Sequence, residues 1–480
     1  MATTKVTGKK GGLGVLSLTG LVVGSVIGGG VFNLMRDMSD SASLAAITIG
    51  WAITGLGMLF LALCFQNLVK KRPDLDAGIY SYAKAGFGNY MGFNAAWGYW
   101  ISAWIGNVAY ATLLFSSVAY FMKTFGDGQN LASVIGASVM LWVVAYLVLR
   151  GVKTASFVNV LVTAAKLIPI GIFLVAAFTA FKLHIFTTDI WGTTSGGFNF
   201  KEVLGQVKGT MLVTVWVFIG IEGAVVFSGR AKKKSSVIRA TFLGLLTVTS
   251  IYFLVTALSL GIKSRPELAA LGQPAMAALL KSIVGSWGAT LINLGLIVSV
   301  SGAWLAWTMF ASELPYQAAK TKTFPGYFAK ENAKGAPVVS LLVTTVLIQA
   351  FLLLFLTKIQ AYSFMYSLAT STILVPYAFT AFYQFKHSYQ EESGTPGRKR
   401  NMAIGAAASL YAIWLVYAAG LTYLLLTVLL YTPAIIIYVM MQIKNREKVF
   451  TAAELSTATA LVAVCAFCIY RVATGQLTIY

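Results

Sequence analysis

The sequence predicts an all-α, polytopic membrane protein, and three observations support that prediction. The chain of 480 residues is 58% hydrophobic with only 11% charged residues, and its mean hydropathy is +0.77. Soluble domains carry about 25% charged residues, so a soluble multidomain enzyme is nearly excluded. At least ten apolar runs reach the roughly 20 residues that a helix needs to cross a bilayer. These runs are continuously apolar rather than alternating, which indicates helices and not a β-barrel.

Thirteen candidate spans follow one another along the chain, which predicts twelve or thirteen transmembrane helices. They lie at residues 13–35, 43–66, 89–122, 132–149, 157–181, 205–229, 238–262, 284–314, 337–356, 361–384, 403–420, 422–441 and 455–472. The last span is the weakest, because Glu454, Arg471 and several threonines flank or dilute it. The pair within 403–441 has almost no connecting loop, which is typical of a tight hairpin.

Lysine and arginine are distributed unevenly between the two sets of loops. One set carries mostly single charges, whereas the other carries clusters such as Lys70/Lys71/Arg72, Lys232/Lys233/Lys234 and Arg398/Lys399/Arg400. Cytoplasmic loops are enriched in these residues, so the richer side and the N-terminus are predicted to be cytoplasmic. The net charge of +21 is then a signal of orientation, and we expect no nucleic acid as a partner.

Glycine interrupts two predicted spans at the same place. Residues 24–30 read GSVIGGG in the first span, and residues 218–224 read FIGIEGA in the sixth. Glycine in a helix interior costs about 1 kcal/mol relative to alanine, so both stretches predict unwound segments. Close packing of helices through small residues is the alternative. The matching position of the two breaks, five spans apart, favours unwinding.

Five is an odd number, so a second copy of a five-span unit must insert upside down. Broken helices at corresponding places in such units indicate a transporter site near the middle of the membrane. The predicted divisions are a cytoplasmic tail (1–12), a first repeat (13–181), an inverted second repeat (205–384), two further helices (403–441) and a C-terminal segment with the last span (442–480). Freed N–H groups suit a carboxylate and freed carbonyls suit an ammonium, so the breaks together suit a zwitterionic amino acid.

Lys166 and Glu222 lie well inside predicted spans, where a charge costs at least about 2.5–3.5 kcal/mol, and Glu313 lies near the end of the eighth span. Lys166, in the fifth span, could replace a sodium ion as a tethered cation or could carry a proton. Its structural alternative is a lysine bonded permanently to carbonyls. Glu222, in the sixth span, could relay protons or act as a gate, and its alternative is a neutral acid that braces the break.

Aromatic residues gather in the same spans. They include Trp216 before Glu222, Trp304 and Trp307 in the eighth span, and Tyr99, Trp100 and Trp104 in the third. A tryptophan face attracts a cationic side chain by about 0.5–2 kcal/mol, although packing and interfacial anchoring are the commoner roles of membrane aromatics. Cys465 and Cys468 have no histidine nearby, so we expect two thiols, and neither a metal nor a cofactor.

Several short motifs resemble a known superfamily. Residues 28–32 (GGGVF) stand where the amino acid–polyamine–organocation transporters have a Gly-Ser-Gly-Val/Ile-Phe motif, and residues 77–88 are similar to their stretch between the second and third spans. Residues 104–107 (WIGN) and 216–222 (WVFIGIE) look very like the basic amino acid antiporters, the branch with arginine/agmatine and arginine/ornithine exchangers. The resemblance covers roughly residues 12–440, and the motifs are specific only when taken together.

The resemblance implies a LeuT-like inverted repeat of five plus five helices, with helices 1 and 6 broken. Within the motif that begins at Gly28, the amides of Gly29 and Gly30 would hold the substrate carboxylate. The ammonium would meet the carbonyls of Val26, Trp216 and Ile219. Gly29 replaces the serine of the family motif, which removes a hydroxyl but keeps the amide.

The resemblance also assigns residues to the pocket for the substrate side chain. Residues that would line, stack on or close it are Ala103, Trp104, Asn107, Trp307 with Trp304 as a competing match, and Ser363 or Ser367. Tyr110 stands one turn after Asn107, where the branch has a thinner side chain, so selectivity for the substrate would differ. Lys166 matches a lysine found in some proton-coupled relatives.

The leading functional hypothesis is antiport of a cationic amino acid, arginine, for a related product, ornithine. Exchange of an amino acid for its decarboxylated amine (histidine/histamine, arginine/agmatine or lysine/cadaverine) and proton-coupled uptake through Lys166 are the alternatives. We expect no enzymatic activity. The expected partners are the amino acid, its exchange product and membrane lipid, and a homodimer is left open. The expected location is the plasma membrane, which would be the inner membrane of a bacterium.

Overall fold

The computed structural model describes residues 15–75, 78–151, 156–222, 234–357 and 361–476, and most of these residues are helical. The α-helices are α1 (Val15–Val26), α2 (Leu34–Ser41), α3 (Leu44–Lys71), α4 (Ile79–Phe87), α5 (Asn89–Phe121), α6 (Leu131–Leu149), α7 (Ser156–Thr179), α8 (Leu183–Phe186), α9 (Phe200–Trp216), α11 (Lys234–Leu260), α12 (Arg265–Ala269), α13 (Ala275–Val284), α14 (Ser286–Lys320), α15 (Val338–Leu353), α16 (Ala361–Gln390), α17 (Arg398–Lys444) and α18 (Ala452–Ala473). An all-α, polytopic membrane fold is thereby confirmed.

The predicted spans correspond to these helices, except that two of the spans form a single element. Eight helical stretches are long and apolar enough to cross a bilayer, and the last of them is Ala452–Ala473, which matches the weakest predicted span. The spans at 403–420 and 422–441 form one element, α17, whose two helical halves meet at Gly420 with a φ of 79°. The tail at 1–12 and the part of the sixth span beyond residue 222 lie outside the described residues.

Four short helices were not predicted from hydropathy. They are α4, α8, α12 and α13, and each is too short or too amphipathic to register as a span. A capping box begins α12. The side chain of Ser264 pairs with the backbone of Glu267, and the side chain of Glu267 pairs with the backbone of Ser264. These hydrogen bonds from Ser264 hold the pKa of the Glu267 carboxyl below its ordinary value.

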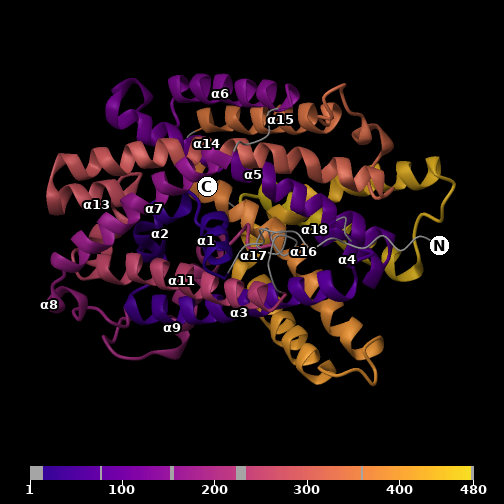
Figure 1. Ribbon diagram of the computed structural model, residues 1–480, viewed down its shortest axis with the longest axis horizontal. Coiled ribbons are helices and arrows are strands. Elements are labelled where there is room, and N and C mark those ends of the chain that lie inside the picture. The colour runs from indigo at the N-terminus through magenta and orange to yellow at the C-terminus, as the bar shows by residue number, and fades with distance from the viewer. Residues whose placement is uncertain (1–14, 76–77, 152–155, 223–233, 358–360, 477–480) are drawn as a thin grey trace.

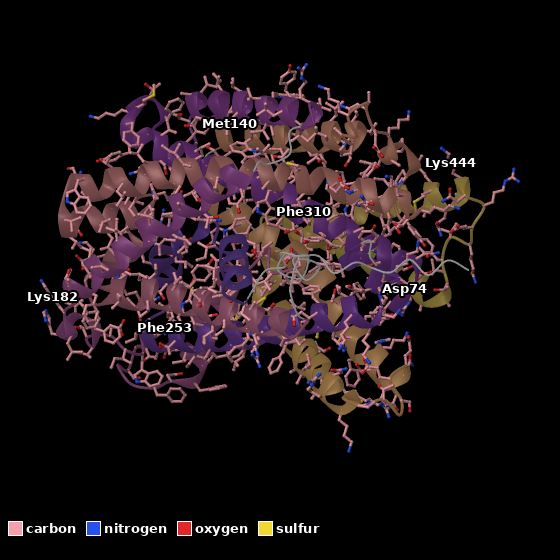
Figure 2. All side chains as sticks on the ribbon, in the orientation of Figure 1. Asp74, Met140, Lys182, Phe253, Phe310 and Lys444 are labelled. Atoms are coloured by element: carbon pink, nitrogen blue, oxygen red, sulfur yellow. The ribbon has the colours of Figure 1, made fainter. Side chains whose placement is uncertain are left out.

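The helices lie largely along one axis, with the connecting segments at its two ends (Figure 1). Lys182, from a loop predicted to be external, lies at one end, whereas Asp74 and Lys444, predicted to be cytoplasmic, lie at the other (Figure 2). Figure 1 also shows α6 and α15 side by side at the top edge, next to α14. The short α1 and α2 pack on interior faces of α11 and α9. This arrangement separates the two sets of loops as the charge pattern predicts.

The outer faces of several helices are apolar. Ile135, Val139, Trp142 and Tyr146 of α6 are all exposed, as are Leu410, Ile413 and Tyr417 of α17. In contrast, α5 is buried along nearly its whole length, with polar residues such as Asn107 and Thr112 fully enclosed. A soluble monomer rarely exposes such large apolar surfaces, whereas membrane-spanning helices ordinarily do.

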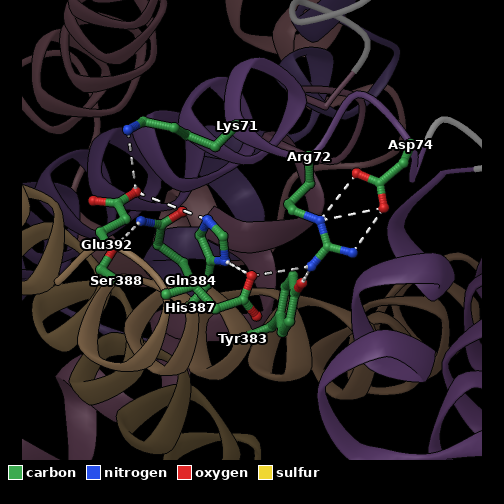
Figure 3. Close-up of polar contacts among 9 residues, drawn as sticks. Lys71, Arg72, Asp74, Tyr383, Gln384, His387, Ser388 and Glu392 are labelled. Atoms are coloured by element: carbon green, nitrogen blue, oxygen red, sulfur yellow. Dashed lines mark hydrogen bonds and ion pairs between the residues drawn. The ribbon is translucent and has the colours of Figure 1, made fainter. Parts of the chain in front are cut away.

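A polar cluster joins the end of α3 to the end of α16 (Figure 3). The Arg72 guanidinium donates to Asp74, with Nη2 2.7 Å from Oδ2, and also to the hydroxyl of Tyr383. Its positive charge and hydrogen bonds hold the pKa of the Asp74 carboxyl below the ordinary value. Buried Glu392 accepts from Asn401 of α17 at 2.8 Å and lies 3.9 Å from Lys71 Nζ. The cluster therefore ties three helices together at one end of the molecule.

Candidate functional site

The first predicted break is present in the structure. Helix α1 ends at Val26, a short 3-10 turn covers Gly30–Phe32, and α2 begins only at Leu34. Across the described residues, the amides of Gly28, Gly29 and Gly30 donate to no acceptor. Buried amides without partners are rare, because each costs about as much as a lost hydrogen bond. The sequence predicts that two of these three amides hold a carboxylate, and all three are free to do so.

The start of the second predicted break lies within the described residues. Helix α9 ends at Trp216, and residues 217–222 form turns rather than helix. Gly220 has a φ of 107°, which L-residues rarely adopt, so glycine is required at this point of the turn. Gly223, the other glycine of the predicted break, lies outside the described residues.

The two breaks lie against each other. A Cβ on Gly220 would lie 3.2 Å from the carbonyl oxygen of Ser25 in the first break. The hydroxyl of Tyr252, from α11, donates to the carbonyls of Val217 at 3.0 Å and of Val26 at 3.4 Å. Tyr252 thus links the ends of both broken helices, which sequence reasoning did not find.

The carbonyls predicted to hold an ammonium are only weakly used within the protein. That of Val26 accepts the long bond from Tyr252, and that of Trp216 accepts from the Ile219 amide at 3.3 Å. The Ile219 carbonyl accepts no hydrogen bond from any described residue. Main-chain donors and acceptors with spare capacity therefore face one another across the breaks.

Three aromatic side chains surround the breaks. A Cβ on Gly30 would lie 3.0 Å from the Trp216 ring, and one on Gly28 would lie 3.3 Å from the Tyr110 hydroxyl. The rings of Tyr110 and Trp216 have centroids 5.9 Å apart. Trp307 Cζ2 would lie 3.8 Å from a Cβ on Gly220. Of the two competing tryptophans of α14, Trp307 is thus the one at the breaks, whereas Trp304 is fully enclosed in the core.

The residues of α5 divide between the breaks and the core. Gly106 contacts the Trp216 ring, since a Cβ there would lie 3.3 Å from Cη2. The neighbouring Asn107 is fully buried, donates to Thr308 at 3.4 Å, and has an Oδ1 without a hydrogen-bond partner. Ala103 is buried one turn earlier. The Trp104 ring packs on Phe351 of α15, with centroids 4.7 Å apart, so its contact is away from the breaks.

Glu222 closes the second break with a network of hydrogen bonds. Its two carboxylate oxygens accept from the hydroxyl of Tyr99, from the hydroxyl of Tyr377 at 2.8 Å, and from the Gly220 amide at 3.2 Å. The network joins α5 and α16 to the break. This geometry fits a gate or a brace directly, whereas the proton-relay role of Glu222 stays a prediction.

Lys166 of α7 is tied to the first break. The side chain is 7% exposed, and Nζ donates to the Gly24 carbonyl at 2.6 Å, in the last turn of α1. This bond fits a strut, a tethered cation and a proton carrier alike. Only the proton carrier requires Lys166 to change its charge during transport.

Lys166→Met keeps the length of the side chain and removes the ammonium. We expect exchange to slow by about tenfold or more, because a charged hydrogen bond contributes roughly 1.5–3 kcal/mol. Rates measured in proteoliposomes across a pH series separate the alternatives, since a strut lowers the rate equally at every pH. The control is Lys182→Met, in an exposed loop. An unchanged rate would show that this bond has no part in transport.

Comparison with known proteins decides the family. The family model described as amino acid permease matches residues 13–471. The chain belongs to the amino acid permease family.

The chain is also similar to several antiporters over most of the length of both proteins. An arginine/ornithine antiporter of Pseudomonas aeruginosa is 46% identical over 472 residues, covering 96% of this chain and 98% of its own length. An arginine/ornithine antiporter of Latilactobacillus sakei is 44% identical and covers 89% of each chain. An arginine/agmatine antiporter of Chlamydia abortus is 41% identical over 95% of this chain and 96% of its own.

Ser363 and Ser367, one or the other of which is predicted to close the pocket, lie on α16, and that role stays a prediction. Both line a cavity together with Tyr366, which lies between them in the sequence. The Tyr366 ring stacks on Trp216, with centroids 6.1 Å apart and planes inclined by 25°. Trp216 and Tyr366 therefore separate the breaks from this cavity.

Several functional candidates were missed from the sequence, and most are tyrosines. Tyr252 bonds both breaks, Tyr377 bonds Glu222, and Tyr366 stacks on Trp216. Tyr99 was recognised only as one of several aromatics. A buried tyrosine hydroxyl needs a hydrogen-bond partner, so tyrosine within an apolar span was the available signal.

Proposed function

We propose that this protein exchanges arginine for ornithine across a bacterial inner membrane, with its N-terminus in the cytoplasm. The observation that carries the proposal is the meeting of two helix breaks with three free amides and weakly used carbonyls, beside Trp216 and Trp307. Three free amides suit the carboxylate of an amino acid, and the facing carbonyls suit its ammonium. The names of the similar antiporters supply the substrate pair.

The side chain of the substrate would extend from the breaks toward α5 and α14. Asn107, with its unpartnered Oδ1, accepts from a guanidinium or an ammonium. The faces of Trp216 and Trp307 attract the same cation. No buried carboxylate is required at this point, which fits the small number of charges in the spans.

Exchange would proceed by alternating access between two barriers. Trp216 with Tyr366 forms the outer barrier, and Glu222 with Tyr99 and Tyr377 forms the inner one. The repeats at 13–181 and 205–384 would be the inverted units that rock around the site. Because one barrier stays closed while the other opens, the site faces one side of the membrane at a time. Each substrate carried outward leaves the site facing outward, where it can bind a substrate to carry inward.

Trp307→Leu tests the stacking role. We expect the dissociation constant for arginine to rise on the order of tenfold, because the variant loses a cation–π contact of about 0.5–2 kcal/mol. Isothermal titration of the purified protein measures it. Trp287→Leu is the matched control, since Trp287 lies on the same helix and is exposed. Equal affinities in both variants would reject the stacking role of Trp307.

One vesicle experiment tests the function itself. Proteoliposomes are loaded with ornithine, agmatine or buffer, and uptake of labelled arginine is followed with and without a pH gradient. We expect rapid uptake only into ornithine-loaded vesicles. Uptake driven by agmatine would favour the amine exchange named for the Chlamydia abortus relative. Uptake into empty vesicles that needs the pH gradient would overturn the proposal in favour of a proton-coupled permease.

A further inference from the structure

A cavity of about 310 Å³ lies on the outer side of the two breaks. It is formed by α2, α9, α16 and the bend of α17 at Gly420. Its charged and polar lining includes Arg36, Asp37, Asp40, Lys208, Gln273 and Tyr366. Small-molecule sites typically enclose about 300–1,000 Å³, so the cavity can hold one small metabolite. Neither the helix breaks nor the Glu222 network contributes to it.

The charges of the cavity are not paired with one another. Two carboxyl groups of the lining, Asp37 and Asp40, come from α2, and Arg36 and Lys208 are its basic side chains. Within the described ranges, no ion pair shorter than 4.0 Å and no side-chain hydrogen bond involves either carboxylate. Lys208 instead lies over the ring of Tyr417, 4.0 Å from its centroid. Ionisable groups that line one space without pairing with each other are available to a charged ligand.

A second, independent feature points into the same cavity. Tyr366 is 5% exposed, and its hydroxyl takes part in no hydrogen bond to any part of the chain that the structure describes. The Oε1 atom of Gln273, from the loop before α13, is also buried without a partner. The Tyr366 hydroxyl is accessible from the cavity that its side chain lines, and a buried amide oxygen such as that of Gln273 ordinarily has a partner. The Tyr366 hydroxyl is therefore free to bind a polar ligand in this space.

We propose that this cavity is an outer binding site for an amino acid with a cationic side chain, one step before the helix breaks. The inference rests on the proposed exchange function and adds a second station to it. Asp37 and Asp40 receive the two positive groups of the ligand, and Arg36 or Lys208 receives its carboxylate. The charges of the lining are then complementary to those of arginine or ornithine, which carry two positive groups and one negative group.

The position of the cavity gives the site its role. Tyr366 lines the cavity with its polar edge and stacks its ring on Trp216, which in turn contacts Gly30. A ligand that rotates Tyr366 and Trp216 aside passes directly from the cavity to the breaks. Carboxylates at the outer station select cations before the neutral main-chain groups of the breaks bind them. Charge recognition and main-chain recognition are thus divided between two places.

Asp37→Asn provides the test in proteoliposomes of known orientation. The KM for arginine is measured from the outer face and from the inner face, with ornithine in saturating excess on the opposite side. We expect the outer KM to rise about tenfold, which corresponds to one lost charge-assisted hydrogen bond. The inner KM and the maximal rate are expected to stay unchanged, because the breaks and both barriers are intact.

Matched variants keep the test specific. Asp127→Asn removes the same charge from an exposed loop predicted to lie on the same side, and it is expected to leave both KM values unchanged. Asp37→Glu is expected to restore most of the outer affinity. If Asp37→Asn does not fold, Asp40→Asn is measured in the same way, since Asp40 is exposed at the mouth of the cavity.

The outcomes separate this inference from the proposed function. If the wild-type protein exchanges arginine for ornithine but Asp37→Asn and Asp40→Asn leave the outer KM unchanged, the outer site is wrong and the exchange function stands. Equal increases of the outer and inner KM would also overturn the outer site, because they would place Asp37 at a station shared by both directions. Absence of exchange by the wild-type protein would instead overturn the proposed function.

Discussion

Gly30→Val is expected to abolish arginine binding, with a loss of affinity on the order of a hundredfold or more. A Cβ at Gly30 would lie 2.8 Å from Val217 Cγ1 and 3.0 Å from the Trp216 ring. A valine brings two further methyl groups into the same space, where the free amides of the first break would meet the substrate carboxylate. Isothermal titration of the purified variant with arginine measures the effect.

Gly20→Val is the control for this variant. Gly20 lies on α1, and a Cβ there would meet no atom within 4 Å. We expect it to bind arginine as the unchanged protein does, and thermal denaturation shows whether both variants are folded. A folded Gly30→Val protein with normal affinity for arginine would mean that the substrate does not bind at the first break.

Glu222→Ala is expected to have the second largest effect. The substitution leaves the hydroxyls of Tyr99 and Tyr377 without their acceptor, and each buried group left unsatisfied costs about 1–3 kcal/mol. The inner barrier and the turn at Gly220 both lose a support. We therefore expect the exchange rate in proteoliposomes to fall by at least about tenfold, together with a lower melting temperature.

Glu313→Ala is the matched control, because Glu313 lies within a predicted span but is exposed and bonds only Gln317 among the described residues. It is expected to change neither the exchange rate nor the melting temperature appreciably. If Glu222→Ala is folded and exchanges at the normal rate, the Glu222 network is not part of the transport cycle.

Much of the fold could be predicted from hydropathy and glycine alone. A span of the membrane needs a long apolar run whatever it packs against, so the boundaries of α3, α5 and α6 agree with the predicted spans within a few residues. The break at Gly28–Gly30 was visible because three consecutive glycines oppose a helix locally. Signals of this kind depend on the segment itself and not on its neighbours.

The partners of the site could not be predicted in the same way. Trp304 and Trp307 are one turn apart on α14, so helical periodicity places them on similar faces, and only the packing of α14 shows which one reaches Gly220. The contacts of Tyr252 and Tyr366 depend on how α11 and α16 approach the breaks. Ser363 and Ser367 line the cavity beside Tyr366, and whether either of them closes the pocket at the breaks stays a prediction.

The central claim is that main-chain groups of two broken helices hold the substrate. A cryo-electron microscopy map of the full-length protein with arginine tests it most directly. The claim predicts density for one arginine at the breaks, with its carboxylate at the amides of Gly29 and Gly30 and its ammonium at the carbonyls of Val26 and Ile219. Arginine bound elsewhere, with both breaks unoccupied at saturating concentration, would contradict the claim.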